Sequence, residues 1–250
     1  MADIGHCYGS EYHMMRFLAH HKNELENIIK ANTPFKYPYK WMDYPYDQNR
    51  LSFDGEHVGI NFLENFIEFN EIKQKWSKFW PQTGTAQNWD AIFLEDKKVV
   101  LVEAKAHIEE IRQSCDASEK SRELIGNSFQ IAKKYFGLNL DKDWFNNYYQ
   151  LANRLAFVYF LKTCGIESYV LNIYFINGYI KRIKMNNKII IKQNRSVTTV
   201  EEWEEAIEMQ YECLGLKNTM ALNYVQKIFV DCLRENKKRT KSESLTTSSN

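Results

Sequence analysis

One short segment restricts the choice of fold more than any other part of this chain. Residues 98–107 begin with a lysine and four consecutive aliphatic residues and then carry Glu103, Lys105 and His107 at alternate positions. A continuous aliphatic run of this length is typical of a strand that is buried on both faces, and such strands occur where helices cover both sides of a sheet. The segment therefore predicts an α/β domain.

The charged residues at the end of this strand are the first indication of function. Alternate side chains on a strand face opposite ways, so Glu103, Lys105 and His107 share one face. A buried carboxylate or ammonium is costly unless it pairs with an opposite charge or binds a cation. We therefore expect these side chains to have partners that offset the cost of their burial.

A second carboxylate is expected beside the first. Residues 88–94 predict another strand, and the polar turn at 95–97 joins it to the first as a β-hairpin. This pairing puts Asp90 almost opposite Glu103. Two carboxylates that close repel each other unless a divalent cation lies between them, and oxygen ligands favour Mg²⁺ or Mn²⁺. Lys105 could then neutralise charge on a phosphate or position a water molecule.

The spacing of Glu103 and Lys105 is common and carries little information by itself. The same acidic-x-Lys spacing occurs at Glu71, Glu95 and Asp96, where a helix face or a turn predicts solvated charges. Glu103 differs from these because it ends a buried strand that pairs with a strand carrying an aspartate.

Asp90, followed after twelve residues by Glu103-Ala104-Lys105, resembles the motif of the PD-(D/E)XK nuclease superfamily. The expected order of elements is also similar to the αβββαβ core of that superfamily, a restriction-endonuclease-like mixed β-sheet flanked by helices. That order comprises helix 57–80, hairpin 88–106, helices 118–136 and 144–163, and strand 168–176. The resemblance covers about residues 57–177. Trp89 stands where the superfamily has its proline, and the strand before residue 88 is not evident.

The resemblance implies a metal-dependent nuclease that hydrolyses phosphodiester bonds of DNA, with RNA the less favoured substrate. Asp90 and Glu103 would bind Mg²⁺ or Mn²⁺, and Lys105 would assist the attacking water. Strandedness, sequence specificity, endo- or exonucleolytic cleavage and pathway are left open, and a homodimer is compatible with the resemblance.

Many members of the superfamily add a glutamate from the helix before the hairpin. Three residues compete for that role here, namely Glu64, Glu68 and Glu71. Glu68 is favoured as a third metal ligand because it lies at the edge of the aromatic stripe of the expected helix 57–80. The alternative is that all three are surface charges.

Further contacts to the substrate are expected from the helix at 144–163 and from the strand end. Gln150 and Arg154 lie one helical turn apart, and this pair resembles the glutamine-bearing helix that some nucleases place over the active site. Arg154 could contact a phosphate, or the two could be an ordinary polar pair. His107 is either a substrate or supporting contact or a solvent-facing histidine, and the second interpretation is favoured.

Two other hypotheses are retained for the chain. It could be a catalytically inactive nuclease-fold module that binds nucleic acid or a partner protein. The charged strand end could also be only a structural ion pair between Lys105 and Glu103 or Asp90, although buried ion pairs are weak stabilisers.

The expected organisation has three parts. Residues 1–56 hold a helix at 10–31 and an aromatic, proline-rich extended segment at 33–47, whose rings are expected to pack on the core more than to stack on bases. Residues 57–234 form the nuclease-like domain with additional C-terminal helices. One of these is capped by Thr198 or Thr199, and another covers 217–234. Residues 235–250 are polar and are expected to be disordered.

Composition excludes several classes of protein. The 5 cysteines are scattered with no Cys-x-x-Cys pair, which indicates reduced thiols and a cytoplasmic protein. No secretory signal and no membrane-spanning apolar run are evident. Motifs for nucleotide phosphates, dinucleotides or a serine nucleophile are missing. The net charge of +1 neither supports nor excludes a nucleic-acid partner.

Overall fold

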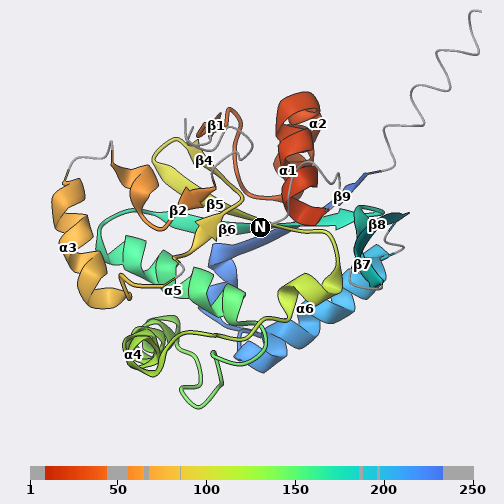
Figure 1. Ribbon diagram of the computed structural model, residues 1–250. Helices are drawn as coiled ribbons and strands as arrows, with labels where there is room; N and C mark the ends of the chain where they lie inside the picture. Colours follow the sequence, from red (N-terminus) through yellow and green to blue (C-terminus); the bar gives the residue numbers. More distant parts are fainter. Residues whose placement is uncertain are drawn as a thin grey trace, which may run out of the picture.

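A mixed five-stranded sheet lies at the centre of the protein, in the strand order β1-β4-β5-β6-β9 (Figure 1). This computed structural model describes residues 9–43, 56–64, 68–84, 86–185, 188–195 and 198–232. The sheet consists of β1 (Lys40–Trp41), β4 (Ala91–Glu95), β5 (Lys98–Lys105), β6 (Ser168–Ile176) and β9 (Val225–Asp231). Two smaller pairs are β2 (His57–Val58) with β3 (Asn88–Trp89), and β7 (Tyr179–Met185) with β8 (Lys188–Arg195).

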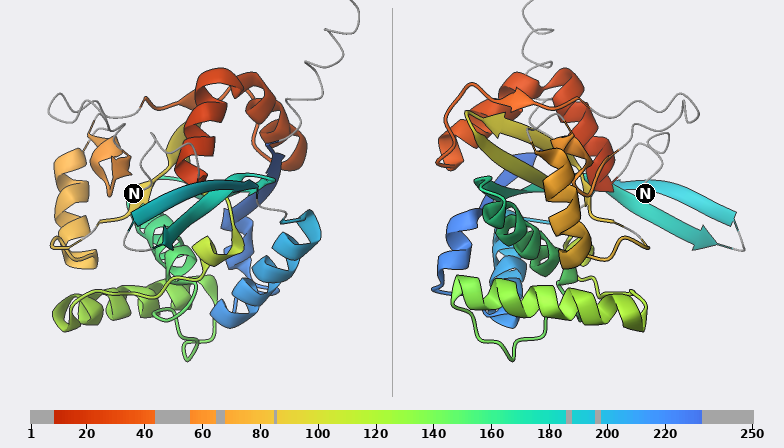
Figure 2. Two further views of the ribbon diagram at one scale, coloured as in Figure 1. Left: turned by 45° about the vertical axis from the view of Figure 1, so that its right-hand side comes forward. Right: turned by 90° about the vertical axis from the view of Figure 1, so that its left-hand side faces the viewer.

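Helices cover both faces of the sheet. They are α1 (Gly9–His20), α2 (Lys22–Asn32), α3 (Phe69–Phe79), α4 (Glu119–Phe136), α5 (Tyr149–Thr163) and α6 (Val200–Leu214). Helices α1 and α2 lie on one face, α5 and α6 lie on the other, and α4 packs against α5 (Figures 1 and 2). The β7–β8 hairpin extends away from these layers (Figure 2). Three short 3₁₀ turns complete the described elements, η2 (Asn61–Leu63), η3 (Ile108–Ile111) and η4 (Met220–Tyr224).

Strand β5 is the central strand of the sheet, as its aliphatic run predicts. It pairs antiparallel with β4 and parallel with β6, and every residue from Val99 to Lys105 is buried. Val99 and Leu101 pack in the core that includes α5, whereas Val100 and Val102 pack in the core that includes α1. Two-sided burial explains why this strand does not alternate between apolar and polar residues.

Several predicted elements are confirmed. The β4–β5 hairpin turns at Asp96, which adopts a positive φ of 54°, and Glu95 pairs with Lys98. Strand β6 has the predicted bounds 168–176, and the predicted hairpin at 179–192 forms as β7 and β8. Helix α6 begins with the capping box at Thr199.

The predicted single helix at 57–80 is wrong. Residues 57 and 58 form β2, which pairs antiparallel with β3 in a separate two-stranded sheet. Gly59 follows with a positive φ of 53°, a conformation that a regular helix cannot contain. The helix itself, α3, begins only at Phe69. The aromatic stripe at Trp76 and Trp80 still packs in the core, but residues 65–67 lie outside the described residues.

Three other helix predictions need correction. The helix at 10–31 is two helices separated at His21. The helix at 144–163 begins at Tyr149, because Asn147 and Tyr148 adopt positive φ values of 52° and 32°. The helix at 217–234 is instead a 3₁₀ turn and β9, which pairs parallel with β6. Its β-branched and aromatic residues fit a strand, and this pairing covers an edge of β6.

The aromatic N-terminal segment packs on the domain, as the favoured interpretation predicts. Residues 40 and 41 add to the sheet as β1, and Phe35, Tyr39 and Trp41 each contact the ring of Phe93. Residues 44–47 and the predicted disordered tail at 235–250 lie outside the described residues. Within the described parts of the chain, no helix combines the length and apolarity needed to cross a membrane.

Candidate active site at the end of β5

The structure brings Glu103 and Lys105 together on one face of β5. Lys105 Nζ lies 2.5 Å from Glu103 Oε1, and the two residues are only 7% and 4% exposed. Their alternate positions on the strand put both side chains on the face that α5 covers. The pair is therefore held in a setting from which water is almost excluded.

Helix α5 contributes the other partners of Glu103. Gln150 Nε2 donates to Oε1 at 2.6 Å, and Arg154 Nε donates to Oε2 at 2.9 Å. Arg154 Nη2 lies 2.8 Å from the same oxygen and also donates to the main-chain carbonyl of Asn88 at 2.6 Å. The guanidinium rests over the ring of Trp89, 4.4 Å from its centre. Gln150 and Arg154 therefore contact Glu103 directly, while their contact with a substrate stays a prediction.

These cations hold Glu103 ionised. Burial alone would raise the pKa of its carboxyl group, but the charges of Arg154 and Lys105 outweigh that effect and lower the pKa. For the Lys105 ammonium, burial would lower the pKa, whereas the negative charges of Glu103, Asp90 and Glu110 raise it. Both groups are thus charged at neutral pH.

Asp90 lies at the junction of β3 and β4, next to this pair. Its Oδ2 accepts the N–H of Ala104 at 2.6 Å, which ties the carboxylate to the strand between Glu103 and Lys105. Burial and the neighbouring charge of Glu103 raise the pKa of Asp90 from its ordinary value of 3.8 to about 8. Asp90 and Glu103 are therefore close enough to repel each other, as the hairpin register predicted.

His107 is connected to this cluster through Glu110. His107 Nε2 is 3.1 Å from Glu110 Oε1, and Glu110 in turn accepts the N–H of Ala106 at 2.9 Å. The charge of Glu110 acts on Lys105, so His107 is linked to the cluster through Glu110. His107 is thus neither a simple solvent-facing histidine nor a direct partner of Lys105.

Glu68 does not join the cluster. It is an exposed residue at the start of α3, where it adopts a positive φ of 76°. The negative charge of Glu68 helps to raise the pKa of Lys75, and Lys75 also lies near Cys164 at the C-terminal end of α5. Gln150 is near the other end of that helix, about 20 Å away at 1.5 Å per residue.

Glu64 and Glu71 are exposed as well, and Glu71 pairs with Lys75 at 2.6 Å. The interpretation of the helix glutamates as surface charges therefore describes these residues better than a role in metal binding.

Two glutamates that the sequence analysis did not select lie close to the site. Glu56 accepts a hydrogen bond from Asn88 Nδ2 at 2.5 Å, and its charge contributes to the raised pKa of Asp90. Glu110 interacts with Lys105 and His107. Neither glutamate carried a signal, because Glu56 sits before an unpredicted strand and Glu110 sits in a 3₁₀ turn.

The donor chemistry fits a hard divalent cation. A cation between Asp90 and Glu103 would relieve the repulsion that arises when both are ionised, and it would therefore favour the ionised form of Asp90. Among the described residues there is no group of three or more histidine, cysteine, aspartate or glutamate side chains that could hold a metal. Mg²⁺ is commonly held by one or two carboxylates together with water and substrate phosphate, so a pair is sufficient. To bind the cation, Glu103 would have to give up some of its hydrogen bonds to Lys105, Gln150 or Arg154.

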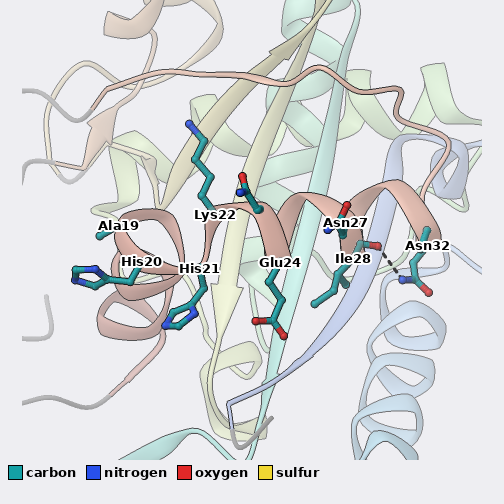
Figure 3. Close-up of a pocket in the computed structure, with 10 residues that line it drawn as sticks. Ala19, His20, His21, Lys22, Glu24, Asn27, Ile28 and Asn32 are labelled. Atoms are coloured by element: carbon teal, nitrogen blue, oxygen red, sulfur yellow. Dashed lines mark hydrogen bonds between the residues drawn. The ribbon is translucent and has the colours of Figure 1, made fainter. Parts of the chain in front are cut away.

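A hollow of about 710 Å³ lies elsewhere, between the end of α1 and α2 (Figure 3). Figure 3 shows Lys22 and Glu24 pointing to opposite sides of the helix, while Asn32 donates to the carbonyl of Ile28 at 2.8 Å. Glu24 is the one carboxylate among its lining residues. The paired carboxylates at β5 therefore make the stronger candidate site.

Comparisons with protein-family models, with curated proteins and with solved structures found no match to this chain. The interpretation of the site therefore depends on its own geometry.

The raised pKa of Asp90 predicts a pH dependence of stability. The folded protein binds this proton more tightly than the unfolded chain, so the contribution is complete below about pH 4 and is lost as the pH rises towards 8. Asp90→Asn cannot ionise. We expect urea unfolding in EDTA to show the variant gaining stability relative to wild type between pH 5 and pH 8. Asp141→Asn, at an exposed loop position, is the matched control, and an equal change in both variants would contradict the assignment.

Removal of the charge at Glu103 should destabilise the fold. Glu103→Gln leaves Lys105 and Arg154 buried without their carboxylate, and breaking such a cluster costs about 3–5 kcal/mol. Urea unfolding at pH 7 measures the loss. Glu109→Gln breaks an exposed pair with Arg112 and should change stability by less than about 1 kcal/mol. Similar losses in the two variants would show that the cluster is not buried as described.

Proposed function

We propose that this protein is a metal-dependent phosphodiesterase of the PD-(D/E)XK type that hydrolyses nucleic acid, with DNA as the expected substrate. The observation that carries the proposal is the convergence of Asp90, Glu103 and Lys105 at one end of β5, next to Gln150 and Arg154 from α5. The mixed sheet with helices on both faces is compatible with a restriction-endonuclease-like core.

Asp90 and Glu103 would hold Mg²⁺ or Mn²⁺. When bound, such a cation lowers the pKa of a water ligand and stabilises charge on the scissile phosphate. The protein's own groups would orient the reactants around that position.

Lys105 is suited to neutralising charge and less suited to removing a proton. Its ammonium stays protonated because Glu103, Asp90 and Glu110 surround it with negative charge. It can therefore donate hydrogen bonds to the attacking water or to a phosphate oxygen, and charge stabilisation of this kind is strong where water is excluded. Both roles that the sequence suggests for Lys105, neutralising charge on a phosphate and positioning the water, suit a protonated ammonium.

Arg154 and Gln150 position Glu103. Arg154 binds one carboxylate oxygen through two nitrogens, and Gln150 donates to the other. Two-point contact fixes the plane of the carboxylate as well as its location. Once Glu103 turns to a cation, the same guanidinium could reach a phosphate oxygen of the substrate.

A non-catalytic module that binds nucleic acid or a partner protein is the second candidate. Its support is the saturation of Glu103, since both oxygens already accept hydrogen bonds from Lys105, Gln150 and Arg154. Under this alternative the cluster would be a structural ion pair, and no divalent cation would enter.

Cleavage assays separate the two candidates. Wild type should cut at least one of single-stranded, duplex and branched DNA and RNA when Mg²⁺ or Mn²⁺ is present, and should not cut in EDTA. Asp90→Asn should lower the rate by about a hundredfold or more, because it removes a cation ligand without leaving a buried charge unpaired. Asp141→Asn should cut like wild type. Full activity of Asp90→Asn, with circular dichroism unchanged, would refute the proposed function.

A further inference from the structure

A second cavity of about 680 Å³ opens directly beside the Glu103 cluster. Asn88, Gln150 and Arg154 belong both to its wall and to the hydrogen-bond network of Glu103. The other walls come from the residues after α3, the segment before α4, the start of α4 and the first turns of α5. Its volume lies within the range of about 300–1,000 Å³ that is usual for small-ligand sites.

Three amide side chains in the wall of this cavity have buried polar atoms without a hydrogen-bond partner. Gln87 is 3% exposed, and neither its Oε1 nor its Nε2 has a partner. Asn153, 8% exposed, has an unpartnered Oδ1, and the Oε1 of Gln150 is also without a partner. Buried polar atoms are paired in the great majority of cases. Three such side chains around one cavity therefore point to a ligand that supplies donors and acceptors.

The chemistry of the wall restricts what that ligand can be. Amide groups that offer both a donor and an acceptor match the edge of a nucleobase, and glutamine and asparagine recognise bases in this way. Trp80 and Tyr149 also line the cavity and provide aromatic surface. Enzymes that take a base out of its stack hold it by hydrogen bonds to its edge and by contacts with aromatic or apolar side chains.

We propose that this cavity binds the base of an unpaired nucleotide, with Gln87 and Asn153 as the residues that recognise its edge. The inference deepens the proposed function, on which it rests for the position of the phosphate beside Glu103. It assigns the substrate to single-stranded nucleic acid or to a strand with a displaced base.

Nucleotide binding tests this assignment without any cleavage. The full-length protein in EDTA is titrated by calorimetry with AMP, GMP, CMP and UMP, with dAMP, dGMP, dCMP and dTMP, and with ribose 5-phosphate as a probe that lacks a base. We expect at least one nucleotide to bind, and ribose 5-phosphate to bind about tenfold more weakly or not at all.

Gln87→Leu keeps the approximate size of the side chain and removes its polar atoms. We expect the nucleotide affinity to fall about tenfold or more, while the melting temperature holds or rises because a buried unpaired amide is removed. Gln74→Leu, at an exposed position on α3, is the matched control and should leave nucleotide affinity unchanged. Asn153→Leu provides the same test if Gln87→Leu does not fold.

The assignment is overturned if no nucleotide binds, if ribose 5-phosphate binds as tightly as the nucleotides, or if the folded Gln87→Leu or Asn153→Leu variant retains wild-type affinity. Its failure is distinguishable from that of the proposed function. A protein that cleaves nucleic acid but binds no nucleotide in EDTA contradicts the base site alone. A protein that binds nucleotides but does not cleave contradicts the nuclease alone.

Discussion

Glu103 is an ionised carboxylate in the middle of a sheet, with 4% of its surface exposed, and water alone could not keep it charged there. Lys105 and Arg154 supply the opposite charge, and Gln150 fills a remaining hydrogen-bonding position. This requirement links the central strand to α5, because the helix has to dock where its arginine reaches the carboxylate. The aliphatic side chains of β5 pack into the cores on both faces of the sheet. The charged end of β5 determines where α5 lies against the sheet.

The same cluster connects structure to the proposed chemistry. Burial and the repulsion between the two carboxylates raise the pKa of Asp90 to about 8. A divalent cation would satisfy both carboxylates, and the neighbouring cavity would hold a nucleotide next to them. If both proposals hold, the buried charges at the end of β5 and the unpaired amides in the adjacent cavity wall are two parts of one site.

The sequence predicted those parts of the site that depend on local pattern. Alternation along a strand puts Glu103 and Lys105 on one face, and a spacing of four residues puts Gln150 and Arg154 on one face of a helix. The polar residues between the two strands predict the hairpin turn. The pattern does not place Glu68 correctly because the expected helix 57–80 is interrupted, and it predicts a helix in place of β9 because the pairing of β9 with β6 is not local. Contacts of Glu56 and Gln87 also depend on distant segments, which no local pattern encodes.

Calorimetric titration of the metal-free protein with Mn²⁺ tests the central claim most directly, since that claim concerns a cation held between Asp90 and Glu103. The account predicts that wild type binds Mn²⁺ and that Asp90→Asn, still folded by circular dichroism, loses this binding while Asp141→Asn retains it. Equal binding by wild type and Asp90→Asn, or no binding by the folded wild type, would contradict it.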